Sequence, residues 1–219
     1  MSESSQPHDQ ASGKLRPLRV VGSLSSLPDN VIGAANLNVW GVVAFMMIEG
    51  MGFALCGAAA LYLASQGKGW PPSGTAPPDL SFGIAFTILL LASEVLNRWV
   101  DRKAWAHDLA GLRLGMVLIT AVGVVLIGVR ALELMHLNVR WSDNAYGSTI
   151  WLLMVLHTSH LITDVADTAV QTEWLFRKEI EDKQFSGASD NCLYWDFVVL
   201  TWLPIWGLVY WMPRFWGGS

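Results

Sequence analysis

The sequence predicts an all-α membrane protein, a bundle of five transmembrane helices with its N-terminus inside and its C-terminus outside. Of its 219 residues, 53% are hydrophobic and only 15% are charged, whereas soluble domains usually carry about 25% charged residues. Five apolar stretches are each about 20 residues long, which suffices for a helix to cross a hydrocarbon core of about 30 Å. The twelve tryptophans fit membrane–water interfaces, where an indole ring keeps one edge wet.

Turn-forming residues separate the apolar stretches and set the predicted organisation. Asp108 and Gly111 stand between the second and third stretches, and Asn144 and Gly147 between the third and fourth. We therefore expect a flexible polar tail on the cytoplasmic side over residues 1–36, a five-helix transmembrane domain over 37–214 and a short tail over 215–219. The expected helices cover about residues 39–63, 80–99, 112–134, 148 onwards to about 183, and 194–212.

The distribution of lysine and arginine predicts the orientation. Cytoplasmic loops of membrane proteins carry an excess of these residues. With the N-terminus inside, ten of the fourteen fall on the inner side. These ten are Lys14, Arg16, Arg19, Arg98, Arg102, Lys103, Arg113, Arg177, Lys178 and Lys183, and the outer side keeps Lys68, Arg130, Arg140 and Arg214.

Glu49 is the most conspicuous polar residue within an apolar stretch. It lies near the middle of the first expected helix, with no basic residue one turn away. An ionisable group at the bilayer centre costs about 2.5–3.5 kcal/mol on insertion scales, so it needs a partner or a purpose. Two interpretations remain open: a proton-handling site, or a protonated carboxyl that bonds across a helix interface.

His157 and His160 are three residues apart and share one face of the fourth expected helix, while Glu133 closes the third. We expect Glu133 and the two histidines to tie these helices together by hydrogen bonds. Metal ligation by this set, with His136, is an alternative, but a second Glu-x-x-His motif of the kind that di-iron bundles use is absent from the sequence. The sequence also has no phosphate-binding glycine loop and no basic patch for nucleic acid.

Several segments, taken in chain order, resemble subunit III of the haem-copper oxidases (cytochrome c oxidase subunit 3). The resemblance runs from Trp40 to Trp211, and it matches the short bacterial form that lacks the first two of the family's seven helices. Asp196, Val199, Leu156 and Thr158 depart from the family pattern and suggest a divergent branch. The matching motifs are Phe45-x-x-x-Glu49-x-x-x-Phe53, the leucine run ending at Ser93, Glu133, Tyr146-Gly147-Ser148-Thr149, His157-x-x-His160, Tyr194-Trp195-x-Phe197-Val198, Trp202 and Tyr210-Trp211.

The resemblance implies a non-catalytic subunit of an oxygen-reducing, proton-pumping complex in a bacterial inner membrane. Such a subunit binds no redox cofactor or metal itself. It packs against catalytic subunit I, which carries haem and copper, and against subunit II and further respiratory subunits, and it holds phospholipid and supports proton uptake. The expected functional and structural polar set is Glu49, Glu133, His157 and His160, with no catalytic residue. A small-residue surface for close helix approach is expected at Gly50, Gly52, Gly57, Ala58, Ala59 and Ala60.

Three alternatives remain at this point. The chain could be an accessory subunit of a related quinol oxidase or nitric oxide reductase. It could be a stand-alone metal-dependent membrane enzyme built on Glu49, Glu133, His136, His157 and His160. A transporter would show inverted repeats and broken helices at the midplane, and the sequence has neither feature.

Overall fold

The computed structural model describes residues 37–66, 69–177 and 182–216, and the regular structure within them is helical. Five spans are long and apolar enough to cross a membrane, the last of them Gln184–Trp216. The predicted all-α, five-helix fold is therefore confirmed, and the chain is a multi-pass membrane protein. The elements are α1 (Leu37–Gln66), α2 (Leu80–Trp105), α3 (Leu109–Met135), α4 (Ala145–Leu175), α5 (Asp182–Trp206), the π-helical turn η2 (Gly207–Trp211) and α6 (Met212–Trp216).

Part of the predicted organisation falls outside the described residues. This applies to the tail over residues 1–36, to residues 217–219, and to the side chains of Lys14, Arg16, Arg19, Lys68, Lys178 and Lys183. The orientation of the termini accordingly stays a prediction.

Two of the predicted breakers act as helix N-caps. The side chain of Asp108 accepts a hydrogen bond from the backbone N–H of Gly111, 3.1 Å away, and starts α3. Asn144 accepts one from Gly147 N–H at 2.8 Å and starts α4. A side-chain oxygen at this position satisfies one of the N–H groups that the first turn leaves unpaired. Lys103 also donates to Asp108, and these bonds hold the pKa of this carboxyl below its usual range.

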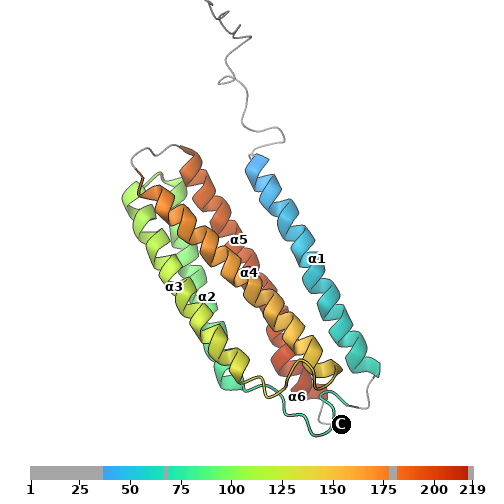
Figure 1. Cartoon of the computed structure of the whole chain (residues 1–219). Helices are drawn as coiled ribbons and strands as arrows, with labels where there is room; N and C mark the ends of the chain where they lie inside the picture. The colour runs from blue at the N-terminus through green and yellow to red at the C-terminus, as the bar shows by residue number, and fades with distance from the viewer. Residues whose placement is uncertain (1–36, 67–68, 178–181, 217–219) are drawn as a thin grey trace, which may run out of the picture. The chain divides into compact units, whose positions relative to one another are not determined.

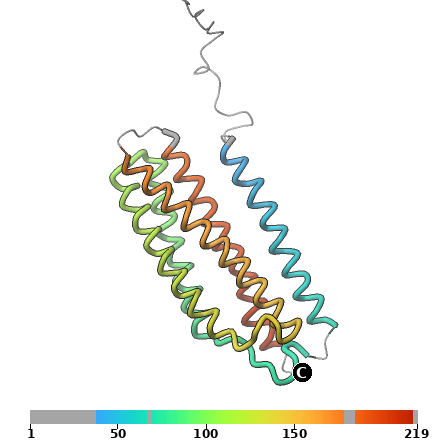
Figure 2. Tube along the Cα trace, viewed as in Figure 1, coloured from blue at the N-terminus to red at the C-terminus, as the bar shows by residue number. Residues whose placement is uncertain are grey.

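Helices α2 to α5 form a closed four-helix bundle in which each helix contacts its two neighbours, in the order α2, α3, α4, α5 and back to α2 (Figure 1). Helix α1 runs along one side of this bundle, next to α4 and α5 (Figure 2). It reaches them through a narrow set of side chains, and most of its large apolar residues are exposed. The candidate site therefore lies within the four-helix bundle and at its contact with α1.

Hydrogen bonds from two indole rings fasten α5 to α2. Trp195 Nε1 donates to Ser93 Oγ at 3.0 Å, and Trp202 Nε1 donates to Thr87 Oγ1 at 2.8 Å. Asn97 Nδ2 continues the row with a bond of 2.9 Å to the carbonyl of Cys192. In lipid the apolar surface of a helix gains little from contact with another helix, so such polar contacts fix which faces meet.

The predicted small-residue surface of α1 divides between two faces. Gly57 and Ala60 are buried, and a methyl group added at Gly50 would lie 3.6 Å from the ring of Phe197. Ala58 and Ala59 are exposed. Only half of the predicted surface therefore faces the bundle, because residues three and four apart share a face of a helix and consecutive residues do not.

Gly123 marks the closest approach of α3 to α4. A methyl group added there would lie 2.5 Å from Val165 Cγ2, whereas one added at Gly128 on the same helix would meet no atom within 4 Å. We predict that Gly123→Ala destabilises the protein by about 1–3 kcal/mol through overpacking. Gly128→Ala should be neutral or slightly stabilising, because alanine favours the helix.

Thermal unfolding of the two variants, purified in mild detergent, tests this prediction. A lower midpoint for Gly123→Ala alone is the expected result. Equal midpoints would mean that α4 moves away from α3 at no cost.

Candidate functional site

A buried ion pair lies inside the four-helix bundle, near one end of α3. Arg130 and Glu133 stand one turn apart, with 2.6 Å between Arg130 Nη1 and Glu133 Oε2. Their side chains are 0% and 1% exposed. Taking two charges out of water is costly, so such a pair is stable only where further hydrogen bonds satisfy both groups.

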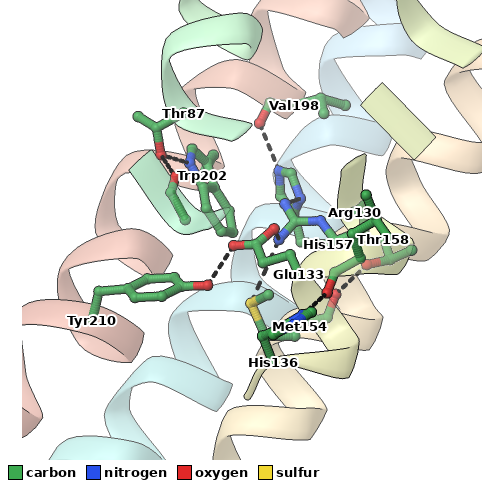
Figure 3. Close-up of polar contacts among 12 residues, drawn as sticks. Thr87, Arg130, Glu133, His136, Met154, His157, Thr158, Val198, Trp202 and Tyr210 are labelled. Carbon is green, nitrogen blue, oxygen red and sulfur yellow. Dashed lines mark hydrogen bonds and ion pairs between the residues drawn. The ribbon is translucent and has the colours of Figure 1, made fainter. Parts of the chain in front are cut away.

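Three neighbouring helices supply contacts to Arg130, and Figure 3 shows those with Trp202 of α5 and His157 of α4. The guanidinium carbon lies 3.6 Å from the ring centroid of Phe86 on α2 and 4.1 Å from that of Trp202 on α5. Arg130 Nη2 lies 3.2 Å from Nδ1 of His157 on α4. The planar cation is thus placed against two aromatic rings, an arrangement worth about 2 kcal/mol when it is desolvated. One side chain of α3 thereby contacts all three other helices of the bundle.

Glu133 is satisfied on its second oxygen by Tyr210, whose hydroxyl donates to Oε1 (Figure 3). Tyr210 is fully buried and belongs to the π-helical turn η2. Pro204 precedes this turn and has no N–H to donate to the helix. Helices often accommodate such an interruption with a π turn, and these turns are frequent at functional sites.

The partners of His157 define its protonation. Nε2 lies 3.0 Å from the backbone carbonyl of Val198, and a carbonyl can only accept, so Nε2 carries a proton. Nδ1 faces Arg130, which can only donate, so Nδ1 is unprotonated. His157 is therefore a neutral ring in the Nε2–H form, and it joins α3 to α5 by accepting from one and donating to the other.

Glu49 forms a second polar group, with partners from α4 and α5. Its Oε2 accepts a hydrogen bond of 2.7 Å from the hydroxyl of Tyr194, and its Oε1 lies 3.1 Å from His160 Nε2. His160 Nδ1 lies 2.6 Å from the carbonyl of Leu156 and must donate to it. A neutral ring with its proton on Nδ1 has none on Nε2. The Glu49–His160 contact therefore requires one further proton, held either by the carboxyl or by the ring.

Phe53 follows one turn after Glu49 and completes the contact of α1 with the bundle. Its ring centroid lies 4.8 Å from that of His160 and 6.3 Å from that of Phe197. Phe53 is buried, while the large apolar residues on the other faces of α1 are exposed. Glu49 and Phe53 thus form the mid-membrane attachment of α1.

The structure corrects the predicted cluster of Glu133 with both histidines. Glu133 and His157 both contact Arg130, but His160 points to α1 and pairs with Glu49. His136 bonds to the carbonyl of Leu132 and stacks on a ring of α2, so it joins neither group. Residues three apart share a broad face of a helix. This face of α4 packs between α1 and α5, so His157 and His160 reach different neighbouring helices.

Arg130 is the site residue that the sequence analysis missed. Arg130 is assigned no partner in the sequence analysis, yet its side chain is fully buried beside Glu133. The signal that could have placed it was its position three residues before Glu133 in an apolar helix, a spacing at which opposite charges pair. Among the residues that the structure describes, no three His, Cys, Asp or Glu side chains come together in a way that could hold a metal ion.

Comparison with known proteins places this arrangement in a family. The sequence profile described as cytochrome c oxidase subunit III matches residues 34–217, which include all five helical spans. The chain belongs to the cytochrome c oxidase subunit III family. It is accordingly one component of a complex with other oxidase subunits.

Curated members of this family align over most of the chain. Cytochrome c oxidase subunit 3 of Thermostichus vulcanus is 24% identical over 182 residues, which are 82% of this chain and 90% of the relative. The Synechocystis protein of the same name is 26% identical over 81% of this chain and 77% of its own. That of Marchantia polymorpha is 29% identical over 82% of this chain and 69% of its own.

Removal of the buried cation tests how far the bundle depends on it. We predict that Arg130→Met costs about 3–5 kcal/mol of stability, because Glu133 is then left as an uncompensated buried charge. The double variant Arg130→Met/Glu133→Gln should recover much of this loss, because no charge then remains at the site.

The control variant is Arg177→Met, which breaks an exposed pair with Glu173 and should cost about 0.3–0.5 kcal/mol. Denaturation midpoints of the purified variants give the comparison. A double variant no more stable than Arg130→Met would contradict the argument from unpaired charge.

The attachment of α1 can be tested by cross-linking. A methyl group at Gly57 would lie 3.3 Å from Leu208 Cδ1, so a short bifunctional thiol reagent should join cysteines at these two positions and link α1 to η2 when Cys56 and Cys192 are replaced by alanine. We predict that Glu49→Leu lowers the yield, because Tyr194 and His160 lose their partner, and that Glu49→Gln retains it. Equal yields in all three backgrounds would assign the attachment to Phe53 alone.

Proposed function

We propose that the chain is a non-catalytic subunit III of a terminal haem-copper oxidase, in which it stabilises the haem- and copper-bearing subunit I and supports proton uptake. The observation that carries this proposal is the family match, because it runs through the whole described bundle from α1 to α6. Subunit II and further respiratory subunits are the other expected partners.

The geometry of the Arg130 group and of the Glu49–His160 pair supports the two proposed roles, stabilisation of subunit I and proton uptake. The Arg130 group links α2, α3, α4 and α5 by fixed contacts, as expected of a scaffold that braces a neighbouring subunit. The Glu49–His160 pair holds a proton inside the membrane at the side of the bundle where α1 is attached. Intramembrane ionisable groups of this kind are often parts of proton relays. The first group accounts for stabilisation, and the second for a contribution to proton uptake.

Haem and copper belong to the partner subunit in this proposal, and phospholipid is the group that this chain itself holds. A groove of about 460 Å³ lies between α1 and the pair α4 and α5. Its walls are almost wholly apolar and include Gly57, Leu61, Leu153, Leu200 and Ile205. Such a groove suits an acyl chain, because both consist of hydrocarbon and neither leaves a polar group unpaired.

The proposed location is a bacterial inner membrane, and the charges of the described residues favour the proposed orientation, with the N-terminus in the cytoplasm. Helix α2 ends, α3 begins and α4 ends at the same end of the bundle at which α1 begins (Figure 1). Arg98, Arg102, Lys103, Arg113 and Arg177 lie there. The opposite end has Arg140 and Arg214. The positive-inside rule places the richer end in the cytoplasm.

Purification of the native complex through a tag on this chain tests the proposed function. We expect a large haem-bearing partner in the subunit masses, haem bands in the reduced-minus-oxidised spectrum, and oxygen uptake driven by reduced cytochrome c. Strains that lack this chain should yield less assembled subunit I.

Other outcomes separate the alternatives. Turnover with quinol in place of cytochrome c, or reduction of nitric oxide in place of oxygen, would assign the chain to a related quinol oxidase or nitric oxide reductase. A colourless protein without partners that contains stoichiometric iron, copper or zinc would overturn the proposal and support a metal-dependent membrane enzyme.

A further inference from the structure

Asp164 is a second intramembrane carboxyl that the proposed function does not use. It lies on α4, one turn beyond His160, and is 1% exposed. Asn191 of α5 donates from Nδ2 to its Oδ1 at 3.1 Å, and Thr168 donates to the amide oxygen of Asn191 at 3.0 Å. These contacts fix the carboxyl at the interface between α4 and α5.

The second oxygen of Asp164, Oδ2, is buried and has no hydrogen-bond partner among the described residues. The charges that act most strongly on the group are those of Asp167 on the same helix and Glu49 on α1, and both are acidic. A buried carboxylate needs a cation or several donors, and Asp164 has one amide donor. The neutral, protonated form avoids this cost, but its O–H then needs an acceptor.

The Glu49 group lies one helical turn away along the same interface. His160 precedes Asp164 by four residues on α4, and Tyr194 follows Asn191 by three on α5, so each helix presents both residues on one face. One turn advances a helix by about 5.4 Å. Two hydrogen bonds of about 2.7–2.8 Å through one water extend over a similar length. Tyr194 and Glu49 also interact electrostatically with Asp164.

We propose that Asp164 is neutral in the membrane and that one internal water at its Oδ2 couples it to the Glu49–Tyr194–His160 group. The carboxyl O–H donates to the water, and the water donates to the carboxyl of Glu49 or the hydroxyl of Tyr194. Two polar partners are the minimum for a buried water, and this position has them. The chain thereby holds a proton-sharing group with a carboxyl on each of two helices.

Infrared spectroscopy of the purified complex tests this, because a protonated carboxyl gives a C=O stretching band separate from that of a carboxylate. We expect Asp164→Asn to remove one such band, and we expect Glu49→Gln to shift the frequency of that band through the shared water. The band should also shift in heavy water. Glu173→Gln is the matched control: this residue lies on the same helix, is exposed, pairs with Arg177, and should leave the band unchanged.

Two results would overturn the proposal. If Asp164→Asn leaves every protonated-carboxyl band in place, Asp164 is ionised. If Glu49→Gln leaves the Asp164 band unmoved, the two groups are not coupled. If the Asp164→Asn variant fails to assemble, labelling aspartate with a heavy isotope in the unaltered chain should shift the band and so assign it to an aspartate. In the Asp164→Glu variant, the same labelling should no longer shift a protonated-carboxyl band. The proposal does not rest on oxidase activity, because the band belongs to this chain in whatever complex is isolated.

Discussion

The buried pair of Arg130 and Glu133 is the interaction on which the rest of the bundle depends. In lipid, helix faces gain little from apolar contact, so the groups that must not remain unpaired decide how helices pack. The charge of Arg130 is balanced by Glu133, and the guanidinium also contacts His157 and two aromatic rings. These contacts join α3 to α2, α4 and α5 through one side chain, so the cost of burying it favours the observed packing of all four helices.

Helix α1 is held in place differently from the other four helices, because its contact with the bundle is small. Glu49 and Phe53 hold it at mid-membrane, and beyond them the helix borders an apolar groove. Its attachment therefore combines the bonds of one proton-sharing carboxyl with a few ring and small-residue contacts, whereas α2 to α5 share a continuous core. The part of the chain that best suits proton exchange is thus also the part least fixed by packing, and this supports separate scaffold and proton roles in the proposed oxidase subunit.

The sequence by itself determined the fold class and predicted a set of polar residues within the membrane, but it did not place Arg130 in that set. Length and hydropathy suffice for counting spans, since a helix that crosses hydrocarbon must be long and apolar whatever it packs against. Desolvation cost singles out Glu49, Glu133, His157 and His160 by the same reasoning. N-caps such as Asp108 are equally local, because the first turn of a helix always leaves N–H groups unpaired.

Only the tertiary structure decided which of these residues meet. His157 and His160 are indistinguishable by spacing, yet one faces Arg130 and the other Glu49, because the rotation of α4 between α1 and α5 is set by contacts along its whole length. By its position in the sequence, Arg130 is predicted to be a cation at the end of a helix. In the structure its guanidinium is covered by Trp202, which lies 72 residues later in the chain. Pairing between helices is non-local, and no pattern within one helix encodes its partner.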